Sequence, residues 1–315
     1  INADDYNKSK IIELLEANCR ENGCKVLSPG AMSNFPDRFD GFHTYNRCCR
    51  ASEDKGRSSE NMKTYGKDRR AYEYWSDGNI QAANQFMGSK FFAGKSADHI
   101  GPISLGFIHD SHYIQVMNSN ENSSKRDRIK KSDIKKIIEI EKSTKVLPVN
   151  WYSKLIWEHL KKDYLKGSIK LDKYRSVLKQ NMVNYMYSLN VIFEECGEKG
   201  IEFLEEAYLK SKYMYFDYSY GFDSSGNITK QSPRRKTDSS RNEKARFKRI
   251  AIESIKEYNI KGNRNLKISL SEQDEVCIKK ICKDINAGYE VSDVKRSMEK
   301  LMVQVQIRMI KEFCD

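Results

Sequence analysis

One segment in the first half of the chain holds side chains that could carry out hydrolysis. Asp98 and His99 are neighbours, and Asn122 and Lys125 follow after an apolar run. A histidine titrates near neutral pH and can take a proton from water, whereas Asp98 and Asn122 offer hard oxygen atoms that suit Mg²⁺ or Mn²⁺ better than Zn²⁺. Hydrolysis of a phosphodiester needs such a base and such a cation. We therefore expect His99 to be the general base, Asp98 and Asn122 to be magnesium ligands, and Lys125 and Arg126 to lie near phosphate.

The elements around these residues must bring them to one place. Neighbouring residues of a strand point to opposite faces, so Asp98 and His99 can serve one site only at a strand end or on a twisted backbone. A Gly-Pro pair follows them closely, which is typical of a turn that ends a strand. The apolar pattern at residues 114–117 predicts a second short strand, and Asn122 could cap a helix that begins near Ser123.

This order of residues resembles the HNH, or ββα-metal, nuclease motif. In that family an Asp-His pair precedes a loop with Pro and Ser, and a final Asn is followed three residues later by Lys. The positions that match are Asp98, His99, Pro102, Ser104, Gly106, Asn122 and Lys125. The middle position differs, because Tyr113 stands where Asn is commonest, with His112 directly before it. Either His112 or Tyr113 could take the middle role.

A longer stretch is similar to the type IIS restriction endonucleases of the BsaI and BsmBI group. The similarity is carried by residues 96–107, with residues 40–46 and 74–78 upstream, and it spans about residues 28–128. Those enzymes have a single HNH site and cut outside an asymmetric recognition site. The resemblance implies Mg²⁺-dependent hydrolysis of double-stranded DNA in a bacterial restriction-modification system, with a homodimer on DNA as one way to cut both strands.

Two other classes of function stay open on this sequence. One is an HNH nuclease of another kind, such as a homing or phage-defence nuclease. The other is a DNA-binding module whose nuclease motif has decayed, since an Asp-His pair is by itself commonly a surface pair and a Gly-Pro pair only a turn. A neighbouring methyltransferase gene would favour the restriction endonuclease, whereas metal-independent DNA binding without nicking would favour the decayed module.

Length and composition indicate the class of protein. The chain has 315 residues, eight Cys and only five Pro, and no apolar run long enough to span a membrane. Because it starts at Ile1, we expect a fragment of a larger soluble protein, located in a bacterial cytoplasm where thiols stay reduced.

The positive charge is confined to the second part of the chain. Residues 1–127 hold 17 basic and 17 acidic side chains, so the net charge of +12 resides in residues 128–315. A basic region favours a polyanionic partner, although a solvated Lys-rich surface would look the same. Residues 230–267 contain 13 basic and 4 acidic side chains. We expect Arg234, Arg235 and Lys236 to contact DNA phosphates; the alternative is an exposed loop without a partner.

The periodicity predicts an α+β protein that is predominantly α-helical, with the HNH motif embedded in it. We expect three regions: an N-terminal helix and loop-rich region (1–90), the nuclease motif (91–130), and a basic helical domain (131–315) with a mobile loop near residues 221–240. Ser132 with Asp133, Ser271 and Ser292 are the predicted helix caps. Predicted helices of the third region begin near residues 132, 150, 171, 198, 242, 271 and 292.

Four cysteines near the N-terminus could form a structural zinc site. Cys19 and Cys24 are separated by four residues, which zinc sites tolerate, and Cys48 and Cys49 follow after a loop. Adjacent cysteines rarely bind the same ion. Buried free thiols are therefore the alternative.

Overall fold

The computed structural model describes residues 71–125, 128–234, 238–261 and 269–314, together with the isolated helical residues Glu13, Leu14, Ala17 and Glu21. The chain divides into two compact units. The first comprises residues 1–67 and 261–267 and lies almost wholly outside the described residues. The second comprises residues 68–260 and 268–315, and the fold below is the fold of this unit.

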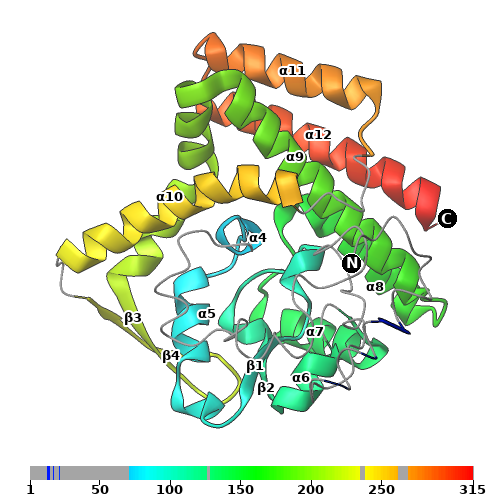
Figure 1. The fold of residues 1–315 in the computed structure, drawn as a ribbon, viewed down its shortest axis with the longest axis vertical. Helices are drawn as coiled ribbons and strands as arrows, with labels where there is room; N and C mark the ends of the chain where they lie inside the picture. The colour runs from blue at the N-terminus through cyan, green and yellow to red at the C-terminus, as the bar shows by residue number, and fades with distance from the viewer. Residues whose placement is uncertain are drawn as a thin grey trace. The chain divides into compact units, whose positions relative to one another are not determined.

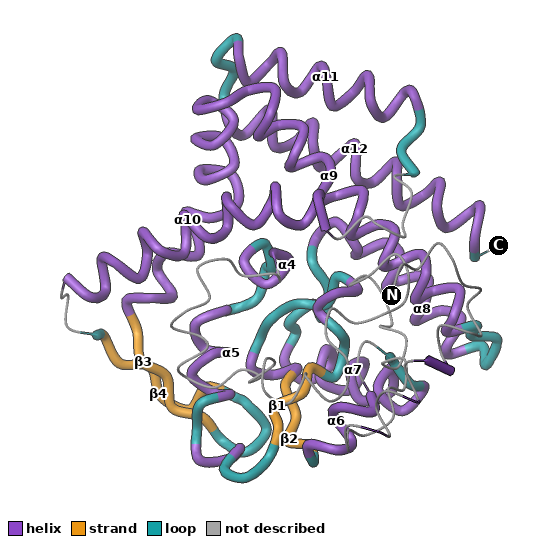
Figure 2. Tube along the Cα trace, viewed as in Figure 1, coloured by secondary structure: helices purple, strands orange, loops and turns teal. Residues whose placement is uncertain are grey.

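The second unit is mostly helical and contains two small antiparallel sheets (Figures 1 and 2). This agrees with the expected α+β class. The α-helices are α4 (Ala71–Tyr74), α5 (Ile80–Met87), α6 (Ser119–Lys125), α7 (Lys131–Thr144), α8 (Lys154–Leu165), α9 (Leu171–Leu204), α10 (Asp238–Lys261), α11 (Glu272–Asn286) and α12 (Val291–Phe313). The strands are β1 (Ser96–His99), β2 (Ile114–Met117), β3 (Tyr218–Phe222) and β4 (Ile228–Pro233). Short 3₁₀ turns lie at Lys90–Phe92 (η2), Ile103–Leu105 (η3), Ser111–Tyr113 (η4) and Trp151–Ser153 (η5).

Helix α9 forms the centre of the helical part and packs against α8, α11 and α12. Its residues 182–186 are buried on every side of the helix, including Met182, Tyr185 and Met186. Apart from Asn184, whose amide donates to Ser269, this segment is apolar all round, and such a helix can be stable only when neighbours cover it. Each large apolar side chain buried in this way stabilises the fold by roughly 1.5–3 kcal/mol.

The long helix is interrupted where the sequence predicts a break. Gly197 has φ 55° and ψ −128°, which breaks the helical path between the predicted segments. Beyond Leu204 the chain continues as a π-helical stretch, Glu205–Leu209, and a 3₁₀ stretch, Lys210–Asp217. The sequence predicts one helix from 198 to about 218, so this last part differs in its winding.

A β-hairpin stands where the sequence predicts a loop near residues 221–240. Strands β3 and β4 pair from Tyr218 with Pro233 to Phe222 with Ile228. The turn is closed by a hydrogen bond from Gly226 N to Asp223 O (3.2 Å). The Ser-, Gly- and Asn-rich composition marks this turn correctly. The loop prediction was wrong because one strand carries few apolar residues and so lacks an alternating pattern.

The predicted helix caps have mixed outcomes. Ser271 accepts a hydrogen bond from Asp274 N (3.2 Å), and the Asp274 carboxylate accepts one from Ser271 N (2.8 Å), so this capping box is confirmed. The cap at Ser292 was wrong, and of the cap predicted at Ser132 with Asp133 only the part of Asp133 is confirmed. Helix α12 already begins at Val291, and α7 begins at Lys131, where Asp133 accepts from the backbone N–H of Lys130 (2.9 Å).

Candidate active site

The site begins at the end of a strand. Strand β1 ends at His99 and pairs antiparallel with β2, with Asp98 opposite Gln115 and His99 opposite Ile114. Helix α6 follows β2 directly and contacts β1. The sequence-based expectation of a strand end at Asp98 and His99 is confirmed.

A tight turn after β1 fixes the direction of this strand end. A Cβ atom on Gly101 would lie 2.2 Å from the ring of Phe107, so no larger residue fits at this position. Phe107 itself is buried and packs edge-on against Trp157. Ile100 N donates to Tyr113 O (2.9 Å), which ties the chain after β1 to the segment before β2. The loop is therefore part of the core.

The carboxylate of Asp98 is held by two neighbours. Lys125, the last residue of α6, places its Nζ 2.5 Å from Asp98 Oδ2, and Gln115 Nε2 donates to the same oxygen (2.9 Å). Asp98 is 7 % exposed and Lys125 is 4 % exposed. Within the described residues, both hydrogen bonds to this carboxylate go to Oδ2. The orientation of Oδ1 is thereby fixed as well.

The ammonium group of Lys125 lies in the interior of the unit. Besides Asp98, it donates to the backbone carbonyls of His99 (2.8 Å) and Ile100 (3.0 Å). An ammonium has three hydrogens, and these three acceptors use them all. We expected Lys125 near a phosphate; the structure places it instead as the tie between α6 and the Asp98–His99 step.

His99 contacts a second histidine that the sequence analysis did not assign. His99 Nε2 lies 2.7 Å from His109 Nδ1, and His109 Nε2 lies 3.1 Å from Asn84 Oδ1 of α5. His109 is 2 % exposed, and its backbone N–H donates to Ser76 Oγ (2.7 Å). The sequence gives little signal for this chain of contacts, because its members are far apart in sequence and meet only in the fold.

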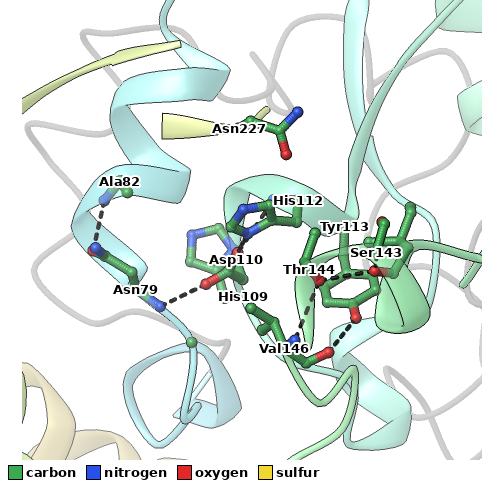
Figure 3. Close-up of polar contacts among 12 residues, drawn as sticks. Asn79, Ala82, His109, Asp110, His112, Tyr113, Ser143, Thr144, Val146 and Asn227 are labelled. Carbon is green, nitrogen blue, oxygen red and sulfur yellow. Dashed lines mark hydrogen bonds and ion pairs between the residues drawn. The ribbon is translucent and has the colours of Figure 1, made fainter. Parts of the chain in front are cut away.

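The two candidates for the middle HNH position, His112 and Tyr113, form hydrogen bonds with Asp110 and Val146 (Figure 3). His112 Nδ1 lies 2.6 Å from Asp110 Oδ1, and Asp110 Oδ2 accepts from Asn79 N (3.0 Å). The hydrogen bond from Asp110 raises the pKa of His112. Burial tends to raise the pKa of Asp110, but the hydrogen bonds from His112 and Asn79 outweigh it, so this pKa lies below its usual value. Tyr113 donates its hydroxyl to Val146 O (2.5 Å).

Asn122 lies inside α6, one turn before Lys125, and is partly exposed. The expected helix start near Ser123 was wrong, because α6 already begins at Ser119. Residues three apart share a helix face, so Asn122 and Lys125 lie on the same side of α6.

In the described part of the chain, no group of three or more His, Cys, Asp or Glu side chains could hold a metal ion. Mg²⁺ needs no such cage, because it keeps several water molecules and commonly uses one or two carboxylates. The chemistry of Asp98 Oδ1 and the Asn122 amide oxygen fits this ion.

The chain matches the model of a known protein family. The model of a type II restriction endonuclease family, RE_Alw26IDE, matches residues 7–312. The chain belongs to this family. No curated protein and no solved structure matches the chain.

Membership of the RE_Alw26IDE family makes the protein a site-specific deoxyribonuclease that binds DNA. The candidate active site lies within the matched region. Each helix in the described ranges is too short or too polar to cross a lipid bilayer.

The predicted phosphate contacts fall mostly outside the described residues. Arg126, Arg235 and Lys236 are among the residues that are not described. Arg234 forms a two-point ion pair with Glu243 of α10, at 2.8 Å and 3.3 Å, and this pair raises the pKa of the guanidinium. Its charge is therefore already balanced within the protein.

The cysteines of the predicted zinc site, Cys19, Cys24, Cys48 and Cys49, also lie outside the described residues. The described cysteines are all free thiols: Cys196, Cys277, Cys282 and Cys314. Burial raises the pKa of the Cys282 thiol to about 12, so this thiol stays protonated and behaves as a small apolar side chain.

Proposed function

We propose that residues 96–125 form the catalytic site of a type IIS restriction endonuclease, and that it is an HNH site which hydrolyses double-stranded DNA with Mg²⁺. The observation that carries the proposal is the position of Lys125. Its ammonium joins α6 to the Asp98 carboxylate and to the carbonyl of His99. Gln115 of β2 donates to the same carboxylate, so both strands and the helix meet at the two side chains with the chemistry for hydrolysis.

In the proposed reaction His99 takes a proton from a water molecule as the water oxygen attacks phosphorus. A P–O bond to the sugar breaks, and the leaving oxygen takes a proton from solvent. Asp98, through Oδ1, and Asn122 would hold Mg²⁺, which when bound stabilises negative charge on the phosphate and the leaving oxygen. Lys125 and Gln115 orient the Asp98 carboxylate, as groups behind a metal ligand commonly do.

The remaining regions would serve binding. The basic helical region, residues 131–315, would hold the DNA through its phosphates, with Arg235, Lys236 and Arg126 as candidate contacts. Two copies of the chain on one DNA molecule would allow both strands to be cut. The N-terminal region, residues 1–90, would carry the possible zinc site.

An alternative is an HNH protein with another biological role, or a DNA-binding module without activity. The observation in its favour is the middle position, where Tyr113 hydrogen-bonds to Val146 O instead of supplying an Asn. An inactive module would bind DNA equally well with and without metal and would never nick it.

The direct test of the proposed function is a plasmid-cleavage assay on the full-length protein. We expect cleavage with Mg²⁺ or Mn²⁺, none with EDTA, and cuts at a fixed distance from an asymmetric sequence. Cleavage that persists in EDTA would contradict the metal-dependent mechanism. Metal-independent binding without nicking would favour the inactive module.

A further inference from the structure

We propose that His109, itself held by Asn84, is a positioning residue that fixes the ring form of His99 in which Nδ1 takes the proton. The inference rests on the proposed role of His99 as general base. It extends that role, because it assigns a function to two residues outside the motif and names the nitrogen that reacts.

The geometry around His109 leaves its ring little freedom. The ring is buried and lies with its centroid 4.9 Å from that of His99. Its backbone is fixed by Ser76, which is fully buried and accepts the His109 N–H. A Cβ atom on Gly78 would lie 2.5 Å from His109 O, so the chain packs closely on this side as well.

The positions of the hydrogens follow from the acceptor at one end. Asn84 Oδ1 can only accept a hydrogen bond, so the hydrogen in the 3.1 Å contact belongs to His109 Nε2. A neutral His109 then carries its lone pair on Nδ1. The hydrogen in the 2.7 Å contact therefore belongs to His99 Nε2. A neutral His99 with a hydrogen on Nε2 has its lone pair on Nδ1, which becomes the basic nitrogen.

The same contact acts during the proposed reaction. When His99 Nδ1 takes the proton from water, the ring becomes a cation with hydrogens on both nitrogens. Its hydrogen bond to His109 Nδ1 is then charge-assisted, and such bonds are roughly twice as strong as neutral ones. His109 thus stabilises the state that forms during the chemical step, with little effect on the binding of DNA.

Three variants test the contact. His109→Leu removes the acceptor, His109→Asn places a shorter acceptor near the position of Nδ1, and Asn84→Leu at an exposed position releases His109 without touching the core. The matched control is His159→Asn in α8, a histidine outside the candidate site whose partner is Tyr174. The measurements are the single-turnover cleavage rate with Mg²⁺ as a function of pH, the Kd for DNA in EDTA, and the ¹⁵N shifts of the ring nitrogens. The protein has only five histidines, so these ring signals can be assigned by single substitutions.

In the wild type we expect His99 to carry its hydrogen on Nε2. His109→Leu should lower the cleavage rate about 10–100-fold, the range seen when a group behind a functional side chain is lost, with an unchanged Kd and a shifted pH profile. His109→Asn should recover most of the rate, Asn84→Leu should lose part of it, and His159→Asn should keep it.

Two results would overturn the inference alone: a hydrogen on Nδ1 of His99 in the wild type, or normal cleavage by both His109→Leu and Asn84→Leu while His99→Ala is inactive. Normal cleavage by His99→Ala would instead overturn the proposed base, and this inference with it.

Discussion

Replacing Lys125 by Met should destabilise the protein far more than the loss of an ordinary lysine. Lysines are almost never fully buried unless they are paired, and here the nearer partner is the equally buried Asp98, with Asp133 Oδ2 at 4.0 Å. Met keeps most of the length and volume of the side chain but removes the ammonium. Asp98 and the carbonyls of His99 and Ile100 then lose a donor in the interior.

The magnitude follows from the type of contact. Removal of one partner of a buried ion pair costs about 3–5 kcal/mol, because the other charge remains without compensation. We therefore expect Lys125→Met to lower the free energy of unfolding by about 3–5 kcal/mol. Asp98→Asn together with Lys125→Met removes both charges. This double variant should be more stable than Lys125→Met alone.

The assay is urea unfolding, with EDTA present so that metal binding contributes nothing. The matched control is Lys131→Met, the same change at an exposed lysine at the start of α7. It should alter stability by less than about 0.5 kcal/mol. If Lys125→Met and Lys131→Met have equal effects, or if the double variant is the least stable of all, the argument from the buried ion pair is wrong.

Three further predictions concern pH, metal and DNA. The pKa of His112 is raised by its hydrogen bond to Asp110, so the protonated ring stabilises the fold fully below pH 6.5, and this contribution is lost as pH rises through the raised pKa. The difference in the free energy of unfolding between wild type and His112→Asn, measured in urea, should therefore shrink from about pH 5 to about pH 8.5. A difference that grows with pH would contradict the assignment. Asp98→Asn should raise the Mg²⁺ concentration for half-maximal cleavage more than Asn122→Ala does, because it removes a full negative charge from the ligands of a hard cation. Equal or reversed effects would argue against these ligands. Arg235→Gln with Lys236→Gln should flatten the salt dependence of DNA affinity by roughly one unit of slope per lost phosphate contact, whereas Arg234→Gln, already paired with Glu243, should leave it unchanged; an unchanged slope in the double variant would mean that these residues do not touch DNA.

Local features of the candidate site could be predicted from the sequence. The Gly-Pro pair after His99 marks the strand end, and the apolar run before Asn118 marks β2. The capping box at Ser271 was predicted for the same reason, since all of its hydrogen bonds join residues close in sequence. Such signals depend only on backbone geometry over a few residues.

Features that depend on tertiary packing could not be predicted from the sequence. Lys125 at the end of a polar helix gives no sign that its ammonium points inward, because exposure is the usual state of lysine. The contact between His99, His109 and Asn84 joins three elements, and no spacing rule relates them. The β3–β4 hairpin was missed because β4 has a polar sequence, and its pairing with β3 is what makes it a strand.

The proposed function depends most on the role of His99 in the chemical step. Its most direct test is single-turnover cleavage of double-stranded DNA by His99→Ala with saturating Mg²⁺, measured beside the Kd for the same DNA. We expect a loss of at least about 100-fold in rate, as is typical for a general base, with a Kd within about twofold of wild type. Cleavage at the wild-type rate would contradict it.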